Sequence, residues 1–173
     1  MNNYSVCTAW GKHEKFFYLL DVFRRRMEYP DLKRKAIELA GLHGAHTVLI
    51  EDKASGTQLI QELSRTGMDG VKAYEPSDND KYMRMVAQTV VFENGRVLLP
   101  KEASWLGEYI KELTGFPGAK YDDQVDSTAQ ALDWLQNHSS NGFFSSDWKL
   151  PERPTQPRFR DPMQFGFRNP LFG

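Results

Sequence analysis

The chain has 173 residues, of which 40% are hydrophobic and 26% are charged, and its formal net charge is -1. This composition is typical of a soluble globular protein with one core of ordinary size. Because the net charge is close to zero, any binding of nucleic acid must depend on local basic patches. The single cysteine, Cys7, excludes an intramolecular disulfide, and with no apolar run of membrane length and no signal-peptide pattern we expect a cytoplasmic protein.

The first 42 residues predict a hairpin and a helix. Two runs typical of β-strands, 4–10 and 16–23, are joined by the polar residues 11–15, which indicates a hairpin with a loop longer than two residues. A helix is expected over 29–42, with Pro30 in its first turn. Its expected buried stripe consists of Leu32, Ala36, Ile37, Leu39 and Ala40.

Strands and helices then alternate along the chain. The expected strands are 47–50, 71–74 and 96–99, and the expected helices are 54–65, 80–92, 104–113 and 122–138. A hairpin followed by alternating strands and helices predicts an α/β fold, with a mixed sheet flanked by helices.

Residues 139–173 differ from the rest because five prolines interrupt any helix. We therefore expect an ordered domain over 1–138 and an extended or disordered tail over 139–173. The arginines and phenylalanines of this tail could contact nucleic acid by phosphate pairing and base stacking. They could equally dock on the same domain or on a partner protein, and the sequence leaves both alternatives open.

An acidic cluster marks the start of the last expected helix. Asp122, Asp123 and Asp126 fall within five residues, so their carboxylates are neighbours on the helix and repel each other by about 0.2–0.5 kcal/mol per pair. Capping of the helix by one aspartate offsets part of this cost.

A second acidic pair, Glu51 and Asp52, ends an apolar strand. Because successive strand residues face opposite ways, we expect Glu51 alone to point into a site shared with the aspartates. We favour a divalent-metal site over a solvated cap, because Mg²⁺ and Mn²⁺ prefer such oxygen ligands.

Several stretches, in the same order, resemble the C-terminal nuclease domain of the large terminase subunit of tailed phages. They are residues 4–7 (YSVC), 20–22 (LDV), 48–56 (VLIEDKASG), 80–84 (DKYMR), 95–100 (GRVLLP) and 121–126 (YDDQVD). The resemblance covers about residues 4 to 136. A resolvase or transposase of the same broad fold shares the acidic arrangement, but the stretches around Lys53, Lys81 and 96–100 go beyond general features of that fold.

The resemblance implies a ribonuclease H-like fold and a metal-dependent endonuclease that cuts concatemeric DNA during genome packaging, with Mg²⁺ or Mn²⁺ as cofactor. It implies double-stranded DNA, the terminase ATPase domain, the small terminase subunit and the portal protein as partners, in the cytoplasm of the host cell. The implied catalytic residues are Glu51, Asp123 and Asp126, the implied metal ligands are these three and Asp122, and the implied DNA-binding residues are Lys53, Lys81 and Arg84. From spacing alone, Lys81 and Arg84 could also form a solvated helix face.

Two family features have no counterpart in this sequence. The family's first catalytic aspartate lies on a central strand before the YSVC strand, and its ATPase domain carries a GxxxxGK(S/T) phosphate loop. We therefore expect an incomplete nuclease, from a prophage remnant, a split gene or a misplaced start, with two unpaired strand edges inside the sheet. The alternative is a noncatalytic remnant that binds DNA or the portal.

Overall fold

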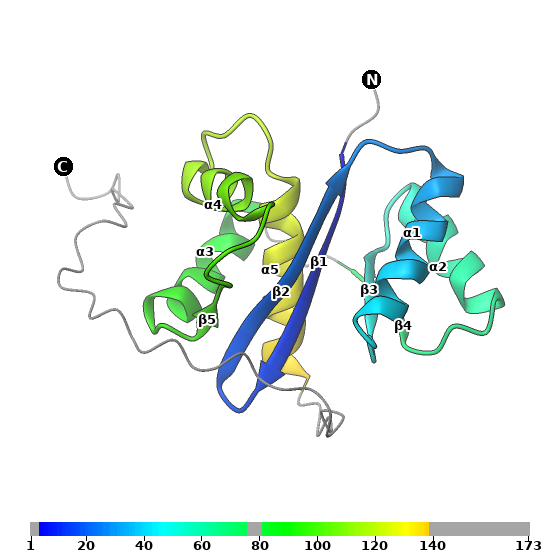
Figure 1. Ribbon diagram of the computed structural model, residues 1–173, viewed down its shortest axis with the longest axis horizontal. Coiled ribbons are helices and arrows are strands. Elements are labelled where there is room, and N and C mark those ends of the chain that lie inside the picture. Colours follow the sequence, from blue (N-terminus) through cyan, green and yellow to red (C-terminus); the bar gives the residue numbers. More distant parts are fainter. Residues whose placement is uncertain (1–3, 76–80, 139–173) are drawn as a thin grey trace. The chain divides into compact units, whose positions relative to one another are not determined.

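The computed structural model describes residues 4–75 and 81–138, which contain five strands and five helices (Figure 1). The strands are β1 (Ser5–His13), β2 (Phe16–Arg25), β3 (Val48–Glu51), β4 (Val71–Tyr74) and β5 (Val97–Leu98). The helices are α1 (Tyr29–Leu42), α2 (Ser55–Arg65), α3 (Lys81–Glu93), α4 (Leu106–Gly115) and α5 (Asp123–Asn137). The expected mixed α/β architecture is confirmed, whereas the tail expected at 139–173 lies outside the described residues.

The first sheet has the strand order β1-β2-β5. β1 and β2 are antiparallel, and β2 pairs with β5 in parallel, with Phe17 opposite Val97. The long hairpin loop expected at 11–15 is wrong, because β1 continues to His13 and only Glu14 and Lys15 form the turn. Polar residues can extend this strand because their side chains find partners on its face: Lys12 donates a hydrogen bond to the carbonyl oxygen of Leu135 in α5.

The second sheet consists of β3 and β4, which run parallel with Glu51 opposite Tyr74. The strands therefore form two separate small sheets (Figure 1). Within the described ranges, the edge of β1 away from β2 and the edge of β3 away from β4 have no strand partner.

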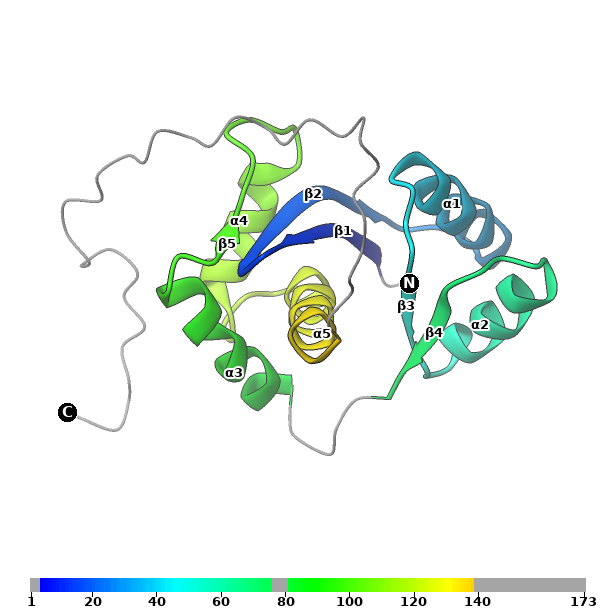
Figure 2. The same cartoon turned by 90° about the horizontal axis from the view of Figure 1, so that it is seen from below.

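The core lies between the first sheet and three helices. α5 packs against β1 and is flanked by α3 and α4 (Figure 2). The inner face of α5 is buried, with Val125 1%, Ala129 3% and Leu132 0% exposed. Full burial of each large apolar side chain contributes about 1.5–3 kcal/mol, so the sheet face and the inner face of α5 hold each other in place.

Helix α1 has the predicted bounds, but its predicted buried stripe is wrong. Only Leu39 is buried, whereas the side chain of Ile37 is 42% exposed. The physical reason is that α1 packs mainly on α2, and a single helix neighbour covers a narrower strip than a sheet face does. Helical periodicity therefore located the helix but overestimated its contact area.

Candidate metal centre

The first turn of α5 is capped by another helix. Asp122 occupies the N-cap position, but its side chain makes no capping hydrogen bond. Instead, Glu112 of α4 accepts a hydrogen bond from the backbone N–H of Gln124 at 2.7 Å and another from the Gln124 side-chain amide at 2.6 Å. Because Glu112 satisfies the backbone donor, the aspartates of α5 remain available for a cation.

Two of these aspartates, Asp122 and Asp126, contact the same lysine side chain. Lys81, the first residue of α3, places its Nζ 2.8 Å from Oδ1 of Asp122 and also bonds Oδ2 of Asp126. Arg84, one turn later, lies 3.9 Å from Oδ1 of Asp126. Asp122 and Asp126 can therefore bridge a single positive charge.

Burial raises the pKa of two carboxylates in this cluster, Asp123 and Asp126. Burial raises the pKa of Asp126, although hydrogen bonding to Lys81 opposes the shift. Burial, the neighbouring Glu112 and Asp122 raise the pKa of Asp123. Burial alone lowers the pKa of Lys81, but hydrogen bonds to Asp122 and Asp126 outweigh it and the pKa is raised. An additional cation beside these carboxylates would be favourable.

Glu51 ends β3 and leads into a constrained loop. Its carboxylate pairs with Lys53 at 3.1 Å. Ala54 has φ +48°, which non-glycine residues rarely adopt, and a Cβ on Gly56 would lie 2.0 Å from the Glu51 carbonyl oxygen. The neighbouring Asp52 accepts a hydrogen bond from the hydroxyl of Thr57 at 2.5 Å, so the two acids of the pair have different partners.

Tyr74, opposite Glu51 in the second sheet, connects the end of β4 to α5. Its hydroxyl donates a hydrogen bond to Asp133 of α5 at 3.1 Å. Burial and Asp133 raise the pKa of Tyr74 to about 12, and the charges of Arg84 and Glu51 act on the same hydroxyl in opposite directions. No sequence pattern singles out Tyr74, because a lone tyrosine at a strand end is common.

The structure brings the expected ligands together only in part. Asp122 and Asp126 converge, but in the described part of the chain no three acidic, histidine or cysteine side chains form a group that could hold a metal ion. The donor chemistry of Asp122 and Asp126 fits Mg²⁺ or Mn²⁺, since both supply carboxylate oxygens to one point. The three expected DNA-binding residues each pair with an expected ligand: Lys53 with Glu51, Lys81 with Asp122 and Asp126, and Arg84 with Asp126.

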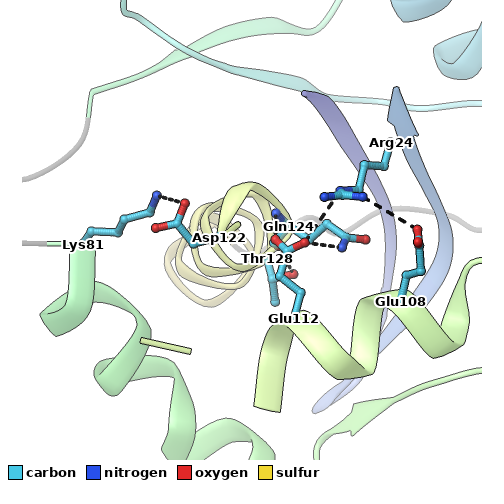
Figure 3. A network of polar contacts seen from close by, with 7 residues as sticks. All are labelled: Arg24, Lys81, Glu108, Glu112, Asp122, Gln124 and Thr128. Carbon is cyan, nitrogen blue, oxygen red and sulfur yellow. Dashed lines mark hydrogen bonds and ion pairs between the residues drawn. The ribbon is translucent and has the colours of Figure 1, made fainter. Parts of the chain in front are cut away.

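A second polar network holds the other side of this helix start (Figure 3). Arg24 of β2 lies 3.7 Å from both Glu108 and Glu112 of α4, and Glu112 bonds Gln124. Thr128 donates its hydroxyl proton to the carbonyl of Gln124 at 2.7 Å. Our reading of the sequence missed this network, although the consecutive arginines at 24–26 could have drawn attention to the end of β2.

Comparisons with known proteins agree with the resemblance. The family described as Terminase RNaseH-like domain matches residues 2–134. A search of curated proteins found no match. Within the described residues, no helix is both long and apolar enough to span a membrane. Since the matched region covers most of the sequence, the chain belongs to the terminase RNase H-like domain family.

Proposed function

We propose that this chain is the nuclease domain of a phage or prophage terminase large subunit, which cuts concatemeric double-stranded DNA during genome packaging. The observation that carries the proposal is the convergence of Asp122 and Asp126 on one cation, while Glu112 caps their helix. Family membership supports the reaction class. The ATPase domain, the small terminase subunit and the portal are the partners that the family implies, in the cytoplasm of the host cell.

We assign Asp122 and Asp126 as the first ligands of Mg²⁺ or Mn²⁺, with Asp123 and Glu51 completing the set. The bound ions would activate water and stabilise the leaving oxygen of the phosphodiester. Lys81 and Arg84 would then exchange their carboxylate partners for DNA phosphate, and Lys53 would do the same beside Glu51. The pairing of Asp122 and Asp126 with Lys81 supports this exchange, because the same two carboxylates that hold its ammonium could hold a metal ion in its place.

The catalytic form needs one more strand. In the described ranges, the edge of β1 away from β2 and the edge of β3 away from β4 have no strand partner. In the family that the chain resembles, the strand with the first catalytic aspartate lies between these two edges. We propose that additional polypeptide, from a longer chain or a second one, fills this position. The isolated chain would then bind metal weakly and cut DNA slowly or not at all.

The test is Mn²⁺ binding, measured by calorimetry and by the rise in melting temperature. A ligand at ten times its Kd stabilises a protein by about 1.4 kcal/mol. We expect Asp126→Asn to lose this effect and Asp69→Asn, an exposed acid outside the cluster, to keep it. Lys81→Gln should bind Mn²⁺ more tightly than the native chain, since it removes the competing ammonium. Absence of Mn²⁺ binding in both the native chain and Lys81→Gln would refute the metal site.

A noncatalytic DNA- or portal-binding remnant is the second candidate. The observation in its favour is that Lys81 already bridges Asp122 and Asp126, as a permanent internal counterion would. This candidate predicts plasmid binding without Mn²⁺-dependent nicking, even when further terminase sequence completes the sheet. Nicking by the completed form, lost in Asp126→Asn, would exclude it.

A further inference from the structure

Next to the acidic cluster lies a surface of two tyrosines and three cations, which we call the tyrosine patch: Tyr4, Tyr121, Arg24, Arg26 and Lys120. The rings of Tyr4 and Tyr121 meet edge to face, with 5.2 Å between their centroids. The guanidinium carbon of Arg24 lies 3.7 Å from the centroid of Tyr4 and 5.1 Å from that of Tyr121. Arg26 covers Tyr4 at 4.7 Å, and Lys120 covers Tyr121 at 5.1 Å.

The three cations of the tyrosine patch have different roles. The side chain of Arg24 is only 14% exposed and lies 3.7 Å from Glu108 and from Glu112, so its charge is balanced internally. Arg24 therefore acts as the support on which the rings rest. Arg26 and Lys120 are exposed, and each lies over one of the two rings. They provide the positive charge that the patch presents to solvent.

The tyrosine patch borders the candidate metal centre. Tyr121 directly precedes Asp122, and the charge of Arg24 acts on Asp123. Arg24 and Lys120 both lie over the ring of Tyr121, at 5.1 Å from its centroid in each case. Two positive charges therefore stand beside the residue that precedes Asp122.

This arrangement addresses an electrostatic problem of the proposed site. Three aspartates repel a DNA backbone. In this structure Lys81 and Arg84 are paired with aspartates of the cluster, and Lys53 is paired with Glu51. A neighbouring surface must therefore supply attraction when DNA first approaches. Exposed lysine and arginine together with tyrosine hydroxyls are side chains that contact phosphate oxygens.

We propose that the tyrosine patch binds the phosphodiester backbone of duplex DNA through Arg26, Lys120 and the two tyrosine hydroxyls, and positions it beside Asp122 and Asp123. The inference deepens the proposed function and rests on it for the identity of the polyanion. The patch contacts backbone and not bases, so its contribution is independent of sequence.

The test is the affinity of the full chain for a 30-base-pair duplex of arbitrary sequence, titrated over a range of salt concentrations. The plot of log K against log salt has a negative slope, and the loss of two phosphate contacts makes this slope shallower by about 1.8. We expect Arg26→Ala/Lys120→Ala to show this change and to weaken binding about 5- to 50-fold at 0.1 M salt. The control Arg65→Ala/Lys72→Ala removes the same charge from exposed positions in α2 and β4 and should leave the slope within about 0.5 of the native value. Equal slopes and affinities for the two double variants would overturn the proposal.

Two further measurements separate this inference from the proposed function. Arg26→Ala/Lys120→Ala should have the melting temperature of the native chain, because both residues are exposed. Mn²⁺ should raise this temperature as much as in the native chain, because neither residue is an assigned ligand. Loss of DNA binding with an unchanged Mn²⁺ response supports the tyrosine patch, even if the chain proves to be noncatalytic. If this variant keeps both the native DNA affinity and the native response to Mn²⁺, the metal site stands and the tyrosine patch does not.

Discussion

Glu112 determines what the first turn of α5 can do. Its buried carboxylate accepts two hydrogen bonds from Gln124 and lies 3.7 Å from Arg24. Substituting Glu112→Ala leaves these buried donors without an acceptor, which costs about 2–4 kcal/mol. Chemical denaturation measures this loss in the free energy of unfolding.

Glu108 provides the matched control for this prediction. It lies at the same 3.7 Å from Arg24, but its side chain is 76% exposed, against 7% for Glu112. Since exposed ion pairs contribute little, Glu108→Ala should cost less than about 0.5 kcal/mol. If the two variants lose equal stability, the argument that Glu112 acts as an external cap is wrong.

Asp123 should destabilise the folded chain when it is ionised. Burial, Glu112 and Asp122 raise its pKa in the folded state, so the folded protein holds this proton more tightly than the unfolded chain does. The associated stability is complete below the unfolded pKa and is lost as the pH rises through the folded pKa. We therefore expect the melting temperature of Asp123→Asn, relative to the native chain, to rise between pH 3 and 7 and to end roughly 1–3 °C higher.

Metal should reverse this difference. In saturating Mn²⁺ the native chain gains stability from ligands that Asp123→Asn lacks, so the variant should fall below it. Thermal melts at pH 7 with EDTA and with Mn²⁺ give the comparison. A variant that is less stable than the native chain in EDTA would contradict the assigned direction of the pKa shift.

At the scale of elements, the turn from β3 to α2 fixes where Glu51 lies. Ala54 has φ +48°, so Ala54→Gly should stabilise the chain by about 0.5–1 kcal/mol. Gly56→Ala should destabilise it by more than about 1 kcal/mol, because the added Cβ would lie 2.0 Å from the Glu51 carbonyl. Urea denaturation distinguishes the two. Destabilisation by Ala54→Gly would mean that the turn is not strained.

Sequence periodicity predicted the elements well and their surroundings poorly. Every expected strand and helix has a counterpart, because the apolar spacing that defines an element is local. The hairpin loop at 11–15 and the buried position of Ile37 were wrong, since both depend on which helix covers a face. At the site, the sequence selected the aspartates by their density. It could not reveal Glu112 or Tyr74, because their contacts with α5 depend on how α4 and β4 are placed in the fold.

At the scale of the whole molecule, polar contacts connect the two small sheets to their surroundings across long sequence separations. Tyr74 at the end of β4 bonds Asp133 of α5, and His43 after α1 lies 3.2 Å from Asp21 of β2. No strand joins the sheets within the described ranges. A strand between β1 and β3 would add a ladder of backbone hydrogen bonds to these side-chain contacts.

The open edges of β1 and β3 therefore give the last prediction. Backbone N–H groups along an unpaired edge exchange quickly with solvent, so alternate amides of β1 and β3 should be poorly protected in this chain. In a form extended upstream with a strand that pairs with both edges, hydrogen exchange should slow at these amides, while those already bonded within the hairpin change little.

The extended form should also gain Mn²⁺-dependent nicking of supercoiled plasmid, and the substitution Asp126→Asn should abolish this nicking. Slowed exchange without nicking would place the defect in the acidic cluster. Unchanged exchange would mean that the added strand does not pair with these two edges.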